Sequence, residues 1–181
     1  MRTRLSAAYK GIHALLMREG AKDFRSGQGY DLTIFFDEGV DIHHIFPQDW
    51  CEAQKIDVKV YDTVINKTPL SYRTNRIIGG VAPSKYLAKL EIGKKTSSGQ
   101  IENPPIDPAT LDGYLISHCI SPGHLRADDF ESFMNERRKS LLALISEATD
   151  HSISDASGAP EEGEEISEEL AHDSGLSTVA A

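Results

Sequence analysis

The sequence predicts an α+β domain in which two short strands and a following helix are flanked by longer helices. Segments 40–46 and 63–70 are rich in β-branched side chains, as strands are. Segment 3–19 and the chain after residue 128 instead carry apolar side chains at the three-to-four spacing of amphipathic helices. Past residue 150 large apolar side chains are almost absent, so we expect a disordered acidic tail.

At the N-terminal end, residues 3–19 are expected to form a packing helix that Gly20 stops. Residues 21–31 are expected to form a turn or loop, because Ser26-Gly27-Gln28-Gly29 stands at their centre. A short strand is expected at 33–36, and Asp37-Glu38-Gly39 reads as a turn before the next strand.

The central segment is expected to contain a strand at 40–46, which Pro47 ends because proline cannot donate to a ladder. Residues 48–55 suit a short helix that packs Trp50 into the core. Residues 58–61 and 63–70 read as strands, since they are β-branched and alternate in polarity.

A helix is then expected from residue 71, capped by Ser71 or Thr74 and broken at Gly79-Gly80. Pro83 suits the start of a second helical piece at 84–90. The order of this central region is therefore strand, loop, strand, helix.

The C-terminal part begins with a connecting loop at 94–108, which is rich in Ser, Gly, Asn and Pro. Asp107-Pro108 is typical of a helix start, and this helix is expected to reach about Cys119. Ser121-Pro122-Gly123 is expected to be a turn. The longest helix should begin near Asp128, with its apolar side chains on one stripe.

The net charge of −9 is concentrated at one end of the chain. Residues 147–181 hold ten Asp and Glu and no Lys or Arg, and the rest of the chain has 18 acidic and 19 basic side chains. Segment 55–95 is basic, with nine Lys or Arg and three acids. A basic segment of this kind suits contact with a phosphate backbone. We expect a domain at 1–149, with its core at about 40–90, and a separate tail at 150–181.

The two cysteines are too few for a disulfide framework, and the chain has no CxxC pair. No apolar run is long enough to span a bilayer, and the N-terminus lacks a signal-peptide core. We therefore expect a soluble protein of the reducing cytoplasm that has no membrane contact.

A constellation of imidazole, amide and cationic side chains lies within the central segment. His43 and His44 stand side by side before Ile-Phe-Pro-Gln, and Asn66 and Asn75 follow nine positions apart. Four cationic side chains accompany them: Lys67, Arg73, Arg76 and Lys85. This set provides side chains that hold a divalent cation, activate a water molecule and bind a phosphate.

The order His-His, Asn, Asn, with these spacings and the Ile-Phe-Pro-Gln trailer, resembles the HNH (His-Me finger) endonucleases. Within them it is similar to the HNH domains of GmrSD-type modification-dependent restriction proteins. The resemblance is strongest over residues 40–90 and leaves the tail uncovered. It implies a ββα-metal core, DNA as substrate, and a metal-dependent endonuclease or nickase of a restriction or antiviral defence system.

The resemblance also implies a role for each residue of the constellation. His44 matches the general base, and His43 stands where the family carries its first metal ligand, usually Asp. Asn75 matches the second metal ligand, whereas Asn66 matches the asparagine that pins the loop and the base. Lys67, Arg73, Arg76 and Lys85 are expected to contact nucleic acid, and Asp41 is a candidate auxiliary group.

Two conditions attach to these roles. Neighbouring residues of a regular strand point to opposite faces, so the strand must twist or end near His43 and His44 if both are to serve one phosphate. The second condition concerns the divalent metal. Mg²⁺ prefers carboxylates, whereas an imidazole ligand favours Mn²⁺ or other transition ions, so the replacement of Asp by His43 leaves both metals open.

Three further questions stay open from the sequence. Zinc bound by His43, His44 and Cys51 is an alternative metal site, although the spacing fits no usual zinc site. The NTPase-like recognition domain of GmrSD-type proteins is expected on another chain or on a longer form of this one. A non-catalytic nucleic-acid-binding or assembly module with the same fold is the alternative function.

Overall fold

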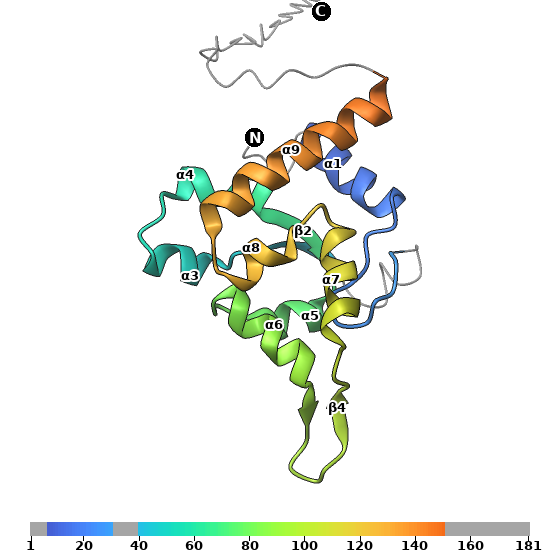
Figure 1. Ribbon diagram of the computed structural model, residues 1–181, viewed down its shortest axis with the longest axis vertical. Coiled ribbons are helices and arrows are strands. Elements are labelled where there is room, and N and C mark those ends of the chain that lie inside the picture. The colour runs from blue at the N-terminus through green and yellow to red at the C-terminus, as the bar shows by residue number, and fades with distance from the viewer. Residues whose placement is uncertain (1–6, 31–39, 151–181) are drawn as a thin grey trace, which may run out of the picture.

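The computed structural model describes residues 7–30 and 40–150 (Figure 1). The chain has a mixed α+β architecture that is mostly helical, with two small antiparallel sheets. The strand expected at 33–36, the turn after it and the acidic tail beyond residue 150 lie outside the described residues.

The first sheet pairs β1 (Asp41–His44) with β2 (Lys67–Leu70) in antiparallel register, Asp41 opposite Leu70 and His44 opposite Lys67. The strand ends at His44, two residues before the expected position. The reason is that the Phe46 N–H bonds to the side chain of Asn66 instead of to a ladder partner.

The segment between the two strands differs from the sequence expectation. After α3 (Gln48–Ala53), residues 58–61 form the short helix α4 (Val58–Tyr61), not a strand. The Asp57 side chain accepts a hydrogen bond from the Lys59 N–H and so caps this turn. The alternating valines, which favoured a strand, remain largely exposed. A 3₁₀ turn, η1 (Val64–Asn66), then precedes β2, so this strand is shorter than expected.

Helix α5 (Tyr72–Ile78) follows β2 directly, and Ser71 caps it by accepting a hydrogen bond from the Thr74 N–H. The buried carboxylate of Asp23 also accepts hydrogen bonds from the Ser71 N–H (3.0 Å) and the Thr74 hydroxyl (2.7 Å). The loop before β1 therefore anchors the start of α5. Gly79 ends the helix with a φ of 55°, a conformation that glycine adopts without strain.

The C-terminal half contains α6 (Pro83–Ile92) and then a hairpin of β3 (Lys94–Lys95) and β4 (Ile101–Asn103), where the sequence suggested only a loop. Helix α7 (Pro108–Ile116) starts at Asp107-Pro108 as expected. The turn expected at 121–123 is the start of a further helix, α8 (Pro122–Arg126), because its proline takes the first helical position.

The long helix α9 (Phe130–Thr149) crosses β2 beside the N-terminal helix α1 (Ala7–Arg18), as Figure 1 shows. Arg137 of α9 is fully buried and donates hydrogen bonds to the backbone carbonyls of Ile65, Lys67 (2.9 Å) and His118 (3.2 Å). Burial lowers the pKa of this guanidinium to about 9. The helix thus fixes the backbone from which β2 begins.

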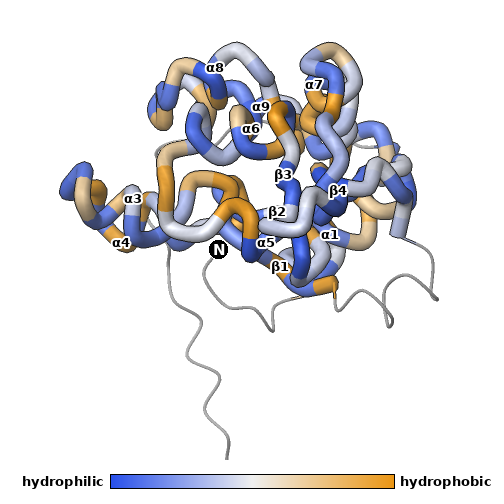
Figure 2. The backbone as a smooth tube through the Cα atoms, turned by 90° about the horizontal axis from the view of Figure 1, so that it is seen from below, coloured by the Kyte–Doolittle hydropathy of each residue, from blue (hydrophilic) through white to orange (hydrophobic). Residues whose placement is uncertain are grey.

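Two apolar clusters form the core. The larger cluster contains side chains of helices α5 through α9 and of the bend after β1. The smaller cluster lies between α1 and α9. Helices α3 and α4 lie against each other at one end of the molecule (Figure 2). Among the described helices, none combines the length and the apolar composition that a membrane span requires.

Candidate active site

Both adjacent histidines reach a small cavity of about 240 Å³ between the end of β1, the start of α3 and the end of α5. Asn75 lines the same cavity, although it lies more than 30 positions further along the chain. The other lining residues are Pro47, Gln48, Asp49, Ile78, Gly79 and Gly80. Three of the residues singled out from the sequence therefore meet in one place.

The end of β1 explains how two adjacent histidines line one cavity. A regular strand would direct His43 and His44 to opposite faces. Here the ladder ends at His44 and the backbone bends over the next two residues, so the constraint applies only up to that point. The condition stated for the sequence is met by this early end of the strand.

The imidazole of His44 has a carboxylate partner that sequence reasoning missed. Asp62 Oδ1 lies 3.0 Å from His44 Nε2 and 2.6 Å from Lys67 Nζ. Burial raises the pKa of Asp62, but the hydrogen bonds and charges of Lys67 and His44 outweigh it and lower the pKa overall. Asp62 therefore stays ionised and fixes one nitrogen of the His44 ring. Its only signal in the sequence is its position in a turn before β2.

Lys67 lies apart from the other candidate DNA contacts. Its side chain is almost completely buried and its ammonium pairs with Asp62. It also lies 5.9 Å from the centre of the Tyr9 ring. Lys67 thus belongs to the support of His44, and we leave it out of the surface that we propose for DNA.

Asn66 is completely buried and binds two separate loops with its side chain. Its Oδ1 accepts a hydrogen bond from the Phe46 N–H at 2.9 Å. Its Nδ2 donates to the carbonyl oxygens of Phe46 (3.0 Å) and Tyr61 (3.1 Å). The amide holds the bend after His44 and the end of α4, which precedes Asp62. Asn66 is therefore placed to position the histidine through the backbone.

The lining of the cavity includes side chains of the types that bind divalent cations. His43 offers an imidazole and Asn75 an amide oxygen, and Asp49 adds a carboxylate to the lining. A Cβ added at Gly80 would overlap the Asp49 carboxylate, so glycine lets this side chain approach. Sequence reasoning missed Asp49, whose one signal is its place in the first turn of α3.

Two other candidate groups lie elsewhere. Asp41 is exposed at the opposite end of β1 and does not line the cavity. Cys51 is buried, with its thiol 3.6 Å from the Phe46 carbonyl oxygen, and burial raises its pKa to about 12. Cys51 does not line the cavity that His43 and His44 share. Across residues 7–30 and 40–150, no group of three or more His, Cys, Asp and Glu is arranged to hold a metal ion.

Two other histidines have structural environments. His118 is buried, with Nδ1 2.6 Å from the Thr68 hydroxyl and Nε2 2.8 Å from the Lys22 carbonyl oxygen. Burial lowers the pKa of His118, and also that of His13, to about 4. Both rings are therefore neutral near pH 7 and serve the packing of the domain.

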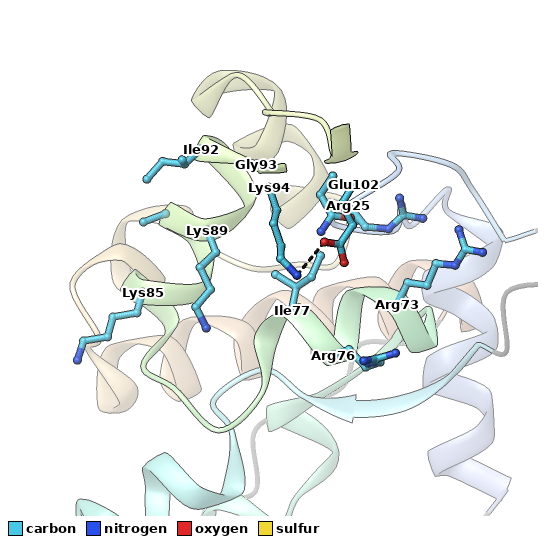
Figure 3. Close-up of a pocket in the computed structure, with 12 residues that line it drawn as sticks. Arg25, Arg73, Arg76, Ile77, Lys85, Lys89, Ile92, Gly93, Lys94 and Glu102 are labelled. Atoms are coloured by element: carbon cyan, nitrogen blue, oxygen red, sulfur yellow. Dashed lines mark ion pairs between the residues drawn. The ribbon is translucent and has the colours of Figure 1, made fainter. Parts of the chain in front are cut away.

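The remaining cationic candidates gather around a second, larger cavity on the other side of α5. Arg73, Arg76 and Lys85 line it together with Arg25, Lys89 and Lys94, which the sequence analysis did not single out as phosphate contacts (Figure 3). Arg25 comes from the loop before β1, so only the tertiary structure brings it to this surface.

Comparisons with known proteins add one similarity. The uncharacterized protein MJ0686 of Methanocaldococcus jannaschii is 28% identical to this chain over 153 residues. The match covers 78% of this chain and 26% of that protein, so the chain spans about a quarter of its relative's length. No family model matches the chain, and no solved structure matches it at the significance threshold applied.

Proposed function

We propose that this domain is a metal-dependent DNA endonuclease or nickase with a ββα-metal core of the HNH type. The observation that carries the proposal is the meeting of His43, His44 and Asn75 at one cavity. Strands β1 and β2 followed by α5 are the elements that the core would comprise. The buried amide of Asn66 supports this assignment, because it fixes the bend behind the histidines.

His44 acts as the general base in this proposal. Its Nε2 is held by Asp62, so the tautomer is set by the carboxylate and the other ring nitrogen is the one that accepts a proton from water. Lys67 keeps Asp62 ionised. Asp62 is therefore a positioning residue, which orients the ring and stabilises the imidazolium that forms.

His43 and Asn75 would hold a divalent metal, Mg²⁺ or Mn²⁺, with Asp49 close enough to the cavity to bind one of its water ligands. When bound, the metal would act as a Lewis acid on the phosphate and its leaving oxygen. His43 and Asn75 are neutral ligands, so the positive charge of the metal would be balanced mainly by the phosphate of the DNA. We therefore expect weak metal binding without DNA.

DNA is the proposed substrate because exposed cations of α5 and α6 line the larger cavity, on the other side of α5 from the histidines. Arg73, Arg76 and Lys85 are the proposed contacts to the phosphate backbone. We place the enzyme in a restriction or antiviral defence system of the cytoplasm, with an NTPase-like recognition domain or subunit as its partner. The isolated free cysteines Cys51 and Cys119 support a reducing compartment.

Plasmid cleavage by the purified protein tests the proposal, with Mg²⁺, Mn²⁺ or EDTA in parallel. We expect nicked or linear DNA with metal and none with EDTA. His44→Ala should lower the rate about 10²–10⁴-fold, the range for loss of a general base. His124→Ala is the matched control, because His124 lies on α8 in ion pairs with Asp129 and Glu136.

Cleavage that persists unchanged in His44→Ala would refute the assigned mechanism. DNA binding that survives EDTA, without cleavage under either metal, would instead support the non-catalytic binding or assembly module.

A further inference from the structure

The larger cavity beside the candidate active site has the size and chemistry of a nucleotide site. Its volume is about 750 Å³, within the range of cavities that enclose small organic ligands. Six cationic side chains line it against one acid, Glu102 (Figure 3). These six are Arg25, Arg73, Arg76, Lys85, Lys89 and Lys94.

The cations are arranged in a way that favours an anionic ligand. Lys85 and Lys89 stand four residues apart on the exposed face of α6, and Arg73 and Arg76 stand three apart on α5. Like charges at these spacings repel each other along a helix. Within the described part of the chain, only Lys94 of the lysines pairs with an acid of the cavity, Glu102 at 2.7 Å. A phosphate bound beside α6 would relieve the repulsion between Lys85 and Lys89.

Part of the cavity lining is apolar, which a phosphate alone does not require. Ile77, Ala88 and Ile92 supply this surface, and the Ile92 side chain is 78% exposed at the edge of a cationic cavity. Tyr72 does not line the cavity, but it is 57% exposed at the start of α5, and its ring centre lies 5.8 Å from the guanidinium of the lining residue Arg76. Apolar surface beside cations, with an exposed ring nearby, is a combination that suits unpaired bases and their phosphates.

Helix α5 is the wall that separates this cavity from the candidate active site. Arg73, Arg76 and Ile77 face the larger cavity, whereas Asn75 and Ile78 face the smaller one. A helix with its side chains is about 10 Å across. The larger cavity therefore lies about one helix diameter from the proposed cleavage position.

We propose that the larger cavity binds an unpaired nucleotide of the DNA strand, with its flanking phosphates, next to the position of cleavage. This inference rests on the proposed function, and it narrows the substrate to DNA with single-stranded or extruded nucleotides. Contact with the backbone of duplex DNA alone would not require a cavity of this volume with apolar side chains in its lining.

Fluorescence anisotropy with a labelled ten-nucleotide dT oligomer, in EDTA so that nothing is cleaved, tests the inference. The variant pair Lys85→Gln/Lys89→Gln should weaken binding about tenfold at low salt and flatten the slope of log K against log[salt] by about 1.4, at 0.7 per phosphate lost. The control pair Lys10→Gln/Lys139→Gln makes the same charge change at exposed positions of α1 and α9 that do not line the cavity, and should change the affinity less than twofold.

Ile92→Ser separates base contact from charge. It should weaken oligomer binding about threefold without changing the salt slope, because a base contact releases no counterion. Ile116→Ser is the matched control, since Ile116 is 62% exposed at the end of α7 and does not line the cavity. Folding of each variant is checked by its circular dichroism spectrum and melting temperature.

Two comparisons identify the source of the nucleotide. A perfectly paired duplex of the same length should bind more weakly than the oligomer, and free dTMP should compete only at much higher concentration than the oligomer. Equal effects of the two lysine pairs, equal binding of duplex and oligomer, or dTMP binding as tightly as the oligomer would each overturn the inference. Failure of the unmodified protein to bind the oligomer, with its plasmid cleavage intact, would refute this site alone, whereas oligomer binding by a protein that shows no metal-dependent cleavage would refute only the proposed nuclease.

Discussion

The side-chain amide of Asn66 is expected to be a principal determinant of the stability of the β1–β2 region. Asn66→Ala removes three hydrogen bonds and leaves the Phe46 N–H, the Phe46 carbonyl and the Tyr61 carbonyl without this partner. Each buried group left unsatisfied costs about 1–3 kcal/mol. Allowing for relaxation and for water entry, we expect a loss of about 3–5 kcal/mol in the free energy of unfolding.

Urea unfolding followed by Trp50 fluorescence measures this loss. Trp50 is the single tryptophan of the chain and packs on Phe46 with ring centres 5.0 Å apart, so it reports on the region that Asn66 holds. Asn66→Asp keeps the acceptor but sets a carboxylate oxygen against two carbonyl oxygens, and it should lose at least as much stability.

The control for this measurement is Asn75→Ala, which makes the same change in a half-buried position of α5. It should alter the free energy of unfolding by no more than about 0.5 kcal/mol, since alanine favours helix and no core contact is lost. An Asn66→Ala loss below about 1 kcal/mol, or an Asn66→Asp protein as stable as the unmodified one, would refute the reasoning.

Four further predictions concern the site, pH and the tail. Asp62→Asn should shift the pH profile of the cleavage rate, because the carboxylate that stabilises the imidazolium is lost, and it should also lower stability, because the buried Lys67 ammonium loses its partner; an unchanged pH profile would remove Asp62 from the mechanism. Asn75→Ala should raise the metal concentration needed for half-maximal cleavage. If this concentration is the same for the variant and the unmodified protein, Asn75 is not a metal ligand. Because burial lowers the pKa of His13 and His118 to about 4, the unfolded chain binds more protons than the folded one between pH 4 and 6.5. The stabilisation from these two neutral histidines should be fully present above pH 6.5. On acidification, the free energy of unfolding should fall by up to about 2–3 kcal/mol per pH unit. Urea titrations at several pH values would measure this fall, and a free energy of unfolding that does not change with pH would contradict the prediction. Deletion of residues 150–181 should change the free energy of unfolding by less than about 1 kcal/mol. It should also strengthen DNA binding at low salt, because the acidic tail no longer competes with DNA, and this difference should shrink as salt screens charges over about 10 Å at 0.1 M. A much lower melting temperature, or an unchanged DNA affinity at low salt, would contradict the prediction.

Local chemistry was enough to locate several elements from the sequence. Ser71 accepts the Thr74 N–H at the start of α5, and Pro108 follows a capping Asp107 at the start of α7, as expected. The glycine after α5 ends it for the same local reason, because only glycine enters the left-handed region without strain. The order of His43, His44, Asn66 and Asn75 likewise pointed to a single site.

Where the sequence failed, the competing structures differ by contacts that are distant along the chain. Residues 58–61 alternate like a strand, but none of the described strands pairs with them, and the capping carboxylate of Asp57 favours a helical turn. The 3₁₀ turn before β2 is held by Arg137, whose guanidinium reaches the Ile65 carbonyl from a helix 72 positions away. The contact of Arg137 cannot be read from a local pattern, whereas the Asp57 cap is local and was overlooked because the alternating valines favoured a strand.

The sequence by itself determined the α+β class, the residues that carry the proposed chemistry and the basic character of the central segment. The tertiary structure decided which of these residues act together. In the folded chain, Lys67 is buried and pairs with Asp62, Asp49 lines the smaller cavity, and Arg25 lines the larger one. The physical reason is that charge and side-chain type are local properties, whereas burial and pairing depend on how distant segments pack.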